Sequence, residues 1–182
     1  MNQLPFPPDA DVGCDVVLGH LREGSFTILA PVVTSAGHTD SRMVQLYRDG
    51  CFAGHAAALA EALTCAAFVG AVETVEYLIG AGVPPDGGRS TGLNAMHWAA
   101  NRGQTAVVLV LIGAGAALEA RNAYGGTVLG AAVWAAVHET KPGHMAVIQS
   151  LLEAGAEVRE AEYPCGDPAV DALLASFGAR VA

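Results

Sequence analysis

Similar groups of apolar and small residues recur along the chain at a spacing of 33 residues. Leu63, Met96 and Leu129 begin three such groups, which read LTCAA, MHWAA and LGAAV. Each group places apolar or small side chains at positions i, i+3 and i+4, the pattern of a helix packed against its neighbours. We therefore expect helices over residues 63–68, 96–101 and 129–135.

A second helix is predicted after each of these groups. A glycine ends the first stretch at Gly70, at Gly103 and, after an insertion of seven residues, at Gly143. From that glycine a β-branched residue, an apolar pair and a second glycine follow at the same distances in all three copies. The second glycine can take the left-handed conformation that closes a helix. The pattern predicts helices over 73–80, 105–113 and 145–154, and thus three helix hairpins joined by turns.

The order of these residues resembles the ankyrin repeat, in which a turn, a Thr-Pro-Leu-His word, a glycine and an apolar pair follow one another over 33 residues. Residues 92–100 (GLNAMHWAA) carry the best copy, although Asn94 and Ala95 replace Thr and Pro. The resemblance is clear over residues 59–158. It implies an all-α, ankyrin-type solenoid of stacked helix-turn-helix repeats with degenerate terminal capping repeats.

The segments on either side carry weaker patterns. Apolar residues over 16–21, with Gly24 behind them, predict half a repeat or an N-terminal cap, and those over 170–177 predict a C-terminal capping helix. The alanine-rich segment 51–61 predicts a helix that continues into the first copy. Residues 1–12 are rich in proline and aspartate and predict a disordered lead, so a single repeat domain is expected over 13–182.

Composition and charge narrow the classes of partner. The chain is 52% hydrophobic and has 9 Lys and Arg against 18 Asp and Glu, a net charge of −9. This charge disfavours nucleic acid and anionic membrane surfaces and favours a protein partner with a basic patch. No apolar stretch reaches the roughly 18 to 20 residues that span a bilayer, so no membrane association is expected.

The start of the chain and its cysteines predict a cytoplasmic protein. Residues 1–11 have neither the positive nor the apolar region of an export signal. The four cysteines are far apart in the sequence, which favours reduced thiols over a disulfide framework. They are Cys14, Cys51, Cys65 and Cys165.

The resemblance also implies a function. Ankyrin-like proteins bind other proteins on the concave surface of the stack, so we expect a non-catalytic interaction module, a stand-alone adaptor or inhibitor without a cofactor. The family's contact positions lie just before and just after the repeated five-residue group, and the insertion adds two further candidate residues. Carried over to this chain, they give Phe68, Leu93, Asn101, Arg102, Tyr124, Trp134, His138 and Glu139. Binding hot spots favour Trp, Tyr and Arg, which singles out Arg102, Tyr124 and Trp134.

Three questions stay open at the level of sequence. Trp134 could pack beneath the insertion as core or be exposed for binding. The inserted loop 136–144 could contribute to binding or be tolerated drift, because extra loop length costs little entropy. The protein could be a monomer or, through its degenerate ends or the apolar stretch near Phe52, a weak homodimer.

Signals of catalysis are weak. The six histidines include no pair at the i, i+4 spacing of metal ligands, and the chain has no GxSxG motif. His97 stands at the family's structural histidine, which implies a hydrogen bond to a turn. Neither catalytic residues nor a metal site are therefore predicted. The alternative is an enzyme with a pocket near the inserted loop 136–144, using Trp134, His138, Glu139 and His144.

Overall fold

The computed structural model describes residues 12–34, 40–139 and 142–180 of the chain. Apart from residue 12, the predicted disordered lead lies outside these residues. The described residues form helices and no β-strand, with a single antiparallel bridge between Arg121 and Thr127. The all-α fold predicted from the sequence is confirmed. The chain divides into two compact units, residues 1–95 and 96–182, and each is described by itself.

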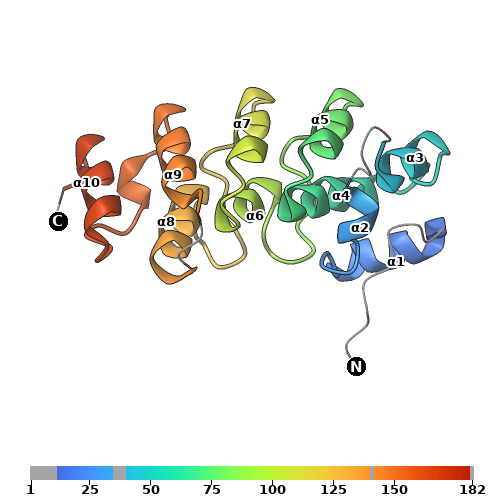
Figure 1. The fold of residues 1–182 in the computed structure, drawn as a ribbon, viewed down its shortest axis with the longest axis horizontal. Coiled ribbons are helices and arrows are strands. Elements are labelled where there is room, and N and C mark those ends of the chain that lie inside the picture. The colour runs from blue at the N-terminus through green and yellow to red at the C-terminus, as the bar shows by residue number, and fades with distance from the viewer. Residues whose placement is uncertain (1–11, 35–39, 140–141, 181–182) are drawn as a thin grey trace. The chain divides into compact units, whose positions relative to one another are not determined.

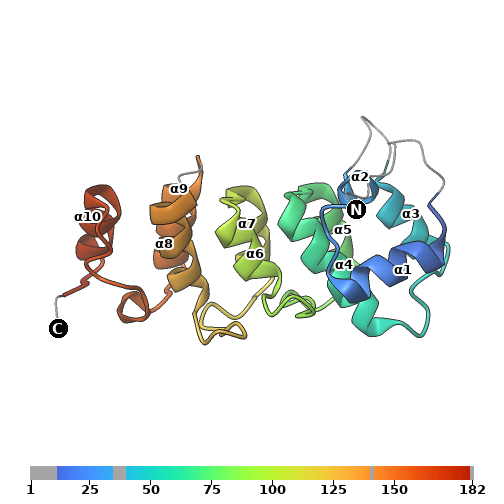
Figure 2. The same cartoon turned by 90° about the horizontal axis from the view of Figure 1, so that it is seen from below.

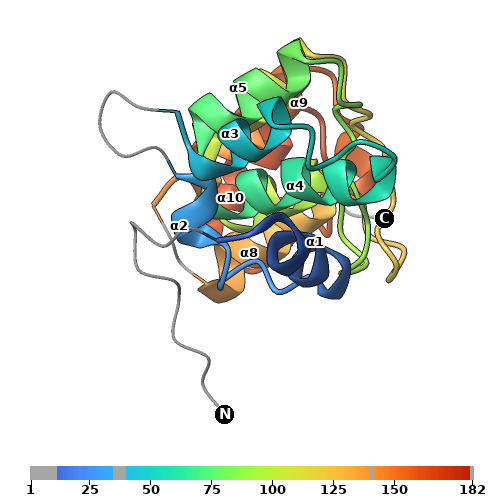
Figure 3. The same cartoon turned by 90° about the vertical axis from the view of Figure 1, so that its right-hand side faces the viewer.

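The first unit is built around its longest helix, α4. Figure 3 looks onto this unit and shows α4 in the middle of α1, α2 and α5, all three of which pack against it, while α3 packs against α2 and α5. The helices of this unit are α1 (Cys14–Glu23), α2 (Ala30–Val33), α3 (Arg42–Arg48), α4 (Ala56–Val69) and α5 (Val72–Gly80).

Small side chains allow α4 to be surrounded in this way. Residues 61–67 of α4 are all buried, and three of them are alanines. An alanine adds little bulk, so the neighbouring helices approach closely. The helix expected from residue 51 begins only at Ala56, because Gly50 and Gly54 have positive φ angles and hold turns at 51–54.

A disulfide joins Cys14, the first residue of α1, to Cys51 in the turn after α3. The expectation of four reduced cysteines is therefore wrong for this pair, whereas Cys65 and Cys165 are free thiols. The two bonded residues are 37 positions apart in the sequence, and their Cα atoms lie 5.6 Å apart. The sequence spacing alone gave no sign of this approach, which the packing of the first unit creates.

The second unit contains two helix hairpins and a C-terminal helix, shown from two directions in Figures 1 and 2. Helix α9 packs against both α7 and α8, and the short η1 contacts α8. Met96 and Leu129, which begin the second and third sequence copies, are buried. The elements are α6 (Ala95–Asn101, in this unit from residue 96), α7 (Thr105–Gly113), α8 (Val128–Glu139), α9 (His144–Glu153), η1 (Val158–Glu160) and α10 (Pro168–Ser176).

The insertion in the third copy lengthens a helix as well as a loop. The sequence predicted that α8 ends near residue 135, but it continues to Glu139. The reason is that no glycine or proline interrupts residues 131–139, whereas Pro142 and Gly143 follow soon afterwards. Residues 140 and 141 lie outside the described residues.

Candidate functional site

A rigid turn precedes α8. The Asn122 side-chain Oδ1 accepts hydrogen bonds from the backbone N–H groups of Tyr124 (2.9 Å) and Gly126 (3.0 Å). The backbone N–H of Asn122 in turn donates to the carbonyl of Gly126 (2.9 Å). Gly125 has a φ angle of 84°, which glycine adopts without steric cost. These bonds hold Tyr124 at the tip of the turn.

Tyr124 projects from this turn, as the sequence predicted. Its exposed fraction of 83% is the largest among the large hydrophobic residues that the structure describes. Arg121 also stabilises the turn. Its Nη1 donates a hydrogen bond to the Gly125 carbonyl (2.9 Å), and its Nη2 donates to Glu160 (2.6 Å). A bulky side chain on a braced backbone loses little conformational entropy when a partner covers it.

Trp134 lies on α8 with 51% of its surface exposed. Of the two alternatives left open by the sequence, the exposed position is the one observed. The His138 imidazole stacks on the indole, with ring centroids 4.6 Å apart and planes 16° apart. His138 also donates from Nδ1 to the Trp134 carbonyl (2.7 Å). The helical extension thus places His138 one turn after Trp134, where it supports the indole.

The remaining predicted residues of the second unit lie at helix ends. Arg102 directly follows α6 and is exposed, whereas Asn101, the last residue of α6, is half-buried. The Asn101 carbonyl accepts a hydrogen bond from His144 Nε2 (2.9 Å), which joins the end of α6 to the start of α9. Glu139 is the half-buried last residue of α8.

Two predicted residues belong to the first unit. Phe68 is half-buried near the end of α4, and its ring lies 5.9 Å from the ring of the buried Phe26. Leu93 is half-buried in the turn before α6. The structure therefore brings Tyr124, Trp134 and His138 into one repeat, and places Phe68 and Leu93 in a separate unit.

The comparison with protein families agrees with this arrangement of hairpins. A family model described as "Ankyrin repeats (3 copies)" matches residues 63–161, more than half of the chain. The chain belongs to the ankyrin repeat family. Ankyrin repeats are generally protein–protein interaction modules and are typically non-catalytic. No curated protein matches the chain.

The family's structural histidine has the expected partner in this ankyrin repeat protein. His97 is buried, and its Nε2 lies 3.1 Å from the Gly126 carbonyl in the turn before α8. Thr64 stands at the same position of the first copy, and its hydroxyl donates to the Gly88 carbonyl (3.1 Å) and accepts from the Gly88 N–H (2.8 Å). In both copies a polar side chain on the first helix fastens the turn that follows.

The two histidines of the catalytic alternative have different partners. His138 stacks on Trp134, while His144 is buried and donates to the Asn101 carbonyl. The described part of the chain holds no group of three His, Cys, Asp or Glu side chains placed to bind a metal ion. The same residues contain no helix that is both long and apolar enough to cross a bilayer.

The two free cysteines are poor nucleophiles. Complete burial raises the pKa of the Cys65 thiol far above its usual value, and the charge of Glu61 acts in the same direction. Burial also raises the pKa of Cys165, with Asp171 contributing in the same direction. Since the thiolate is the reactive form, neither thiol is activated for attack.

An aromatic and arginine cluster on α3 and α5 was missed by the sequence analysis. The Arg48 guanidinium lies 5.0 Å from the centre of the Tyr77 ring, and Nε donates to the Tyr77 hydroxyl (3.1 Å). Tyr47 meets Tyr77 edge to face at 5.8 Å, and Asp40 pairs with Arg48. The hydrogen bond with Tyr77 raises the pKa of Arg48 most, and the bond with Asp40 raises it further. Tyr77 belongs to the first clear copy, but Tyr47 and Arg48 lie on α3, before the clear copies begin, where the repeat pattern gives no signal.

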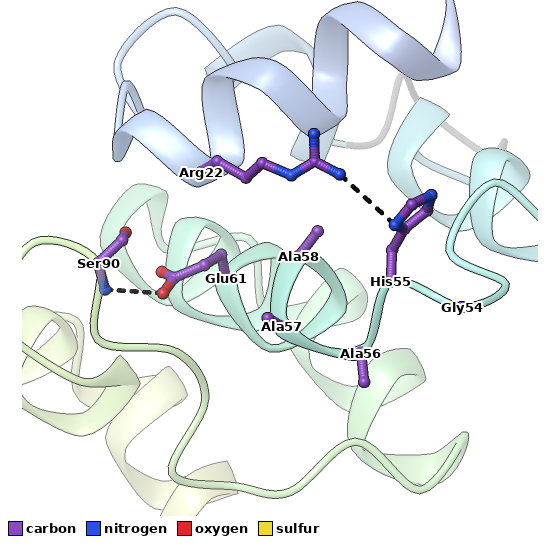
Figure 4. A pocket seen from close by; sticks show the side chains of 8 residues that line it. All are labelled: Arg22, Gly54, His55, Ala56, Ala57, Ala58, Glu61 and Ser90. Atoms are coloured by element: carbon purple, nitrogen blue, oxygen red, sulfur yellow. Dashed lines mark hydrogen bonds between the residues drawn. The ribbon is translucent and has the colours of Figure 1, made fainter.

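A pocket in the first unit was also missed. Its volume is about 330 Å³, and it lies between α1 and the start of α4 (Figure 4). The lining residues come from three segments separated by tens of residues in the sequence, and no local motif marks them. They are Arg22, Gly54, His55, Ala56, Ala57, Ala58, Glu61 and Ser90.

Proposed function

We propose that this ankyrin repeat protein binds a partner protein through the third-repeat surface, defined as Tyr124, Trp134 and His138. The observation that carries the proposal is the exposure of Tyr124 (83%) and Trp134 (51%) in the same repeat. Large aromatic side chains dominate the binding energy of many interfaces, because they bury a large area at little entropic cost. Here Tyr124 lies on a hydrogen-bonded turn and Trp134 on a helix, so both aromatic side chains are already positioned for contact with a partner.

The other residues predicted for binding lie partly in the same unit as this surface and partly in the first unit. Arg102, Asn101 and Glu139 belong to the same unit, and we propose that they extend the contact. Phe68 is left out, because its ring packs on Phe26 within the first unit. Leu93 stays a prediction.

The partner's chemistry follows from the charge of the chain. The second unit contains five Lys and Arg and eight Asp and Glu, and the first unit four and ten, so both are acidic. An acidic protein attracts a partner with a basic patch. We propose that it acts as an adaptor or inhibitor that masks such a patch. Its own state, monomer or weak homodimer, is measured by light scattering.

The disulfide bears on the compartment, which the sequence predicted to be the cytoplasm. That prediction depended partly on reduced thiols, whereas Cys14 and Cys51 form a disulfide. Disulfides persist mainly in oxidising compartments, so we infer that the protein meets its partner in such a compartment. Alkylation of free thiols in protein taken rapidly from its host should leave Cys14 and Cys51 unlabelled. Labelling of both would favour the cytoplasm.

The third-repeat surface is tested by a double variant, Tyr124→Ala with Trp134→Ala. A partner is first captured from a host lysate with the unaltered protein, and its affinity is then measured for each variant. The double variant should bind at least roughly tenfold more weakly, because truncation of one hot-spot side chain already costs about 2 kcal/mol or more, whereas a factor of ten corresponds to about 1.4 kcal/mol. Its far-UV circular dichroism should be unchanged, because both side chains are exposed.

Leu109→Ala is the matched control, because Leu109 is 53% exposed on α7 of the same unit. Removal of this apolar side chain should leave the partner affinity unchanged. If the double variant binds as tightly as the unaltered protein, the third-repeat surface is rejected.

A further inference from the structure

The pocket beside α4 combines a positive end with a negative one. Arg22 extends across it from α1, and its Nη2 lies 3.5 Å from His55 Nδ1 at the start of α4 (Figure 4). Both side chains are exposed, so a ligand can reach them from solvent. The guanidinium of Arg22 is charged at any physiological pH.

The start of α4 adds to the positive end. The first N–H groups of a helix have no partner within the helix, and His55 at the N-cap makes no side-chain capping bond. The first turn of this 14-residue helix also contains no acidic residue. Residues 56–58, which carry these N–H groups, line the pocket. The helix dipole and Arg22 together favour an anionic group here.

Glu61 provides the negative end. The residue is only 7% exposed, and its Oε1 accepts a hydrogen bond from the Ser90 N–H (2.7 Å). Its Oε2 is buried and has no hydrogen-bond partner among the described residues. The carboxyl group occupies space that Gly88 leaves open, because a Cβ added at this position would lie 2.2 Å from the carboxyl carbon. A buried acceptor without a donor is costly, and a ligand N–H would satisfy it.

The geometry points to a ligand whose carboxylate has an N–H donor on the adjacent carbon atom. The last residue of a peptide and a free amino acid share this chemistry. We propose that its carboxylate binds Arg22 and the start of α4, while its N–H donates to Glu61 Oε2. Ala57 and Glu61 lie one helical turn apart, a rise of about 5.4 Å along the axis of α4, so a ligand the size of one amino-acid residue suits the pocket. The methyl groups of the three alanines offer an apolar wall to a small side chain. This site does not depend on the third-repeat surface.

Calorimetric titration of the full chain tests the ligand chemistry. The probes are acetylated tripeptides ending in glycine, alanine, valine or leucine, each with a free carboxylate or as the amide, and the corresponding free amino acids. At least one free-acid tripeptide or free amino acid should bind at millimolar concentration. Each amide should bind roughly tenfold more weakly than its acid, because it loses a charge-assisted hydrogen bond.

Comparison of the peptide acids with the free amino acids shows which of the two kinds of ligand the pocket binds. Tighter binding of the peptide acid assigns the pocket to chain ends, and equal or tighter binding of the free amino acid assigns it to amino acids. Equal binding of acids and amides, or no binding of any acid probe, overturns the proposal.

Variants test the two ends of the pocket. Arg22→Gln should weaken binding of the free acid roughly tenfold or more. Arg42→Gln is the matched control, since Arg42 lies on α3 of the same unit and does not line the pocket. In Glu61→Gln the side-chain oxygen can still accept from Ser90, but an NH₂ group then replaces Oε2, so binding should be lost. Unchanged affinity in Arg22→Gln or Glu61→Gln overturns the proposal.

A change in the ligand tests Glu61 independently of the protein's stability. A free-acid tripeptide with an N-methyl group on its last residue keeps the carboxylate and lacks the N–H. It should bind roughly tenfold more weakly than the unmethylated peptide. Equal affinity of the two peptides would show that Glu61 Oε2 receives no donor from the ligand.

Discussion

At the scale of single residues, Asn122 decides how firmly Tyr124 is held. Asn122→Ala removes the two hydrogen bonds from its Oδ1 to the N–H groups of Tyr124 and Gly126. Because solvent can replace these bonds in an exposed turn, the loss in unfolding free energy should be about 1 kcal/mol. Urea denaturation measures it. Asn122→Asp keeps an acceptor oxygen and should lose less, so equal losses in both variants would contradict this role.

Trp134 depends on His138 in a similar way. In His138→Ala the stacked ring disappears, and the indole should become more mobile. NMR relaxation of the Trp134 indole N–H would show this mobility, with the indole of Trp98 as an internal reference. We expect partner affinity to fall a few fold, because a side chain that is not held in place loses more entropy on binding.

His138→Phe is the control for this prediction, since it keeps an aromatic ring and loses the hydrogen bond. Its Trp134 indole should stay less mobile than in His138→Ala. Unchanged relaxation in His138→Ala would mean that the stacking does not restrain the indole.

The sequence predicted some site residues better than others for physical reasons. Tyr124 was placed correctly, because a turn between two helices exposes its tip regardless of its surroundings. Trp134 could not be assigned, since its exposure depends on how far α8 continues. The pairs Cys14 with Cys51, Arg22 with His55 and Glu61 with Ser90 join residues 29 to 37 positions apart. Such contacts depend on packing, which a local pattern does not reveal.

At the scale of elements, Gly143 fixes the junction between α8 and α9. Its φ angle is 109°, and a Cβ at this position would lie 2.4 Å from the Gly103 carbonyl oxygen. Gly143→Ala must therefore strain or shift the backbone, and we expect a loss of about 3 kcal/mol in unfolding free energy.

Gly115→Ala provides the comparison. Gly115 also has a positive φ, 81°, but nothing lies within 4 Å of an added Cβ. This variant carries only the conformational cost, about 1 kcal/mol. Urea denaturation of both proteins decides the point. Equal losses would show that the contact with Gly103 is relieved without cost.

The repeat pattern predicted the paired helices of the three clear copies because each buries an apolar stripe at fixed spacing. Its failures occur where other forces decide. Glycines at 50 and 54 delay α4 to Ala56, and the absence of a helix breaker lets α8 continue to Glu139. The residue at which a helix ends depends on single residues of this kind, whereas the presence of the helix depends on the many apolar contacts along its length.

The disulfide links the scale of elements to that of the whole molecule, since it closes a loop over much of the first unit. In the chain-entropy model, a cross-link between residues 37 positions apart stabilises the folded state by roughly 4 kcal/mol. Reduction should therefore lower the urea midpoint of unfolding. The variant with Cys14→Ser and Cys51→Ser is the control, because reductant should not affect it. An identical midpoint in oxidised and reduced protein would show that the cross-link adds no stability.

At the scale of the whole molecule, the net charge of −9 makes a prediction about how a partner is bound. Attraction between an acidic protein and a basic patch speeds association more than it slows dissociation. Salt screens it, since the Debye length falls from about 10 Å at 0.1 M to about 3 Å at 1 M. The association rate constant should therefore fall several fold over this range, while the dissociation rate constant changes little. Surface plasmon resonance separates the two constants, and an association rate that is unchanged or rises with salt would mean that apolar contact alone, without a basic patch, brings the partner to the third repeat.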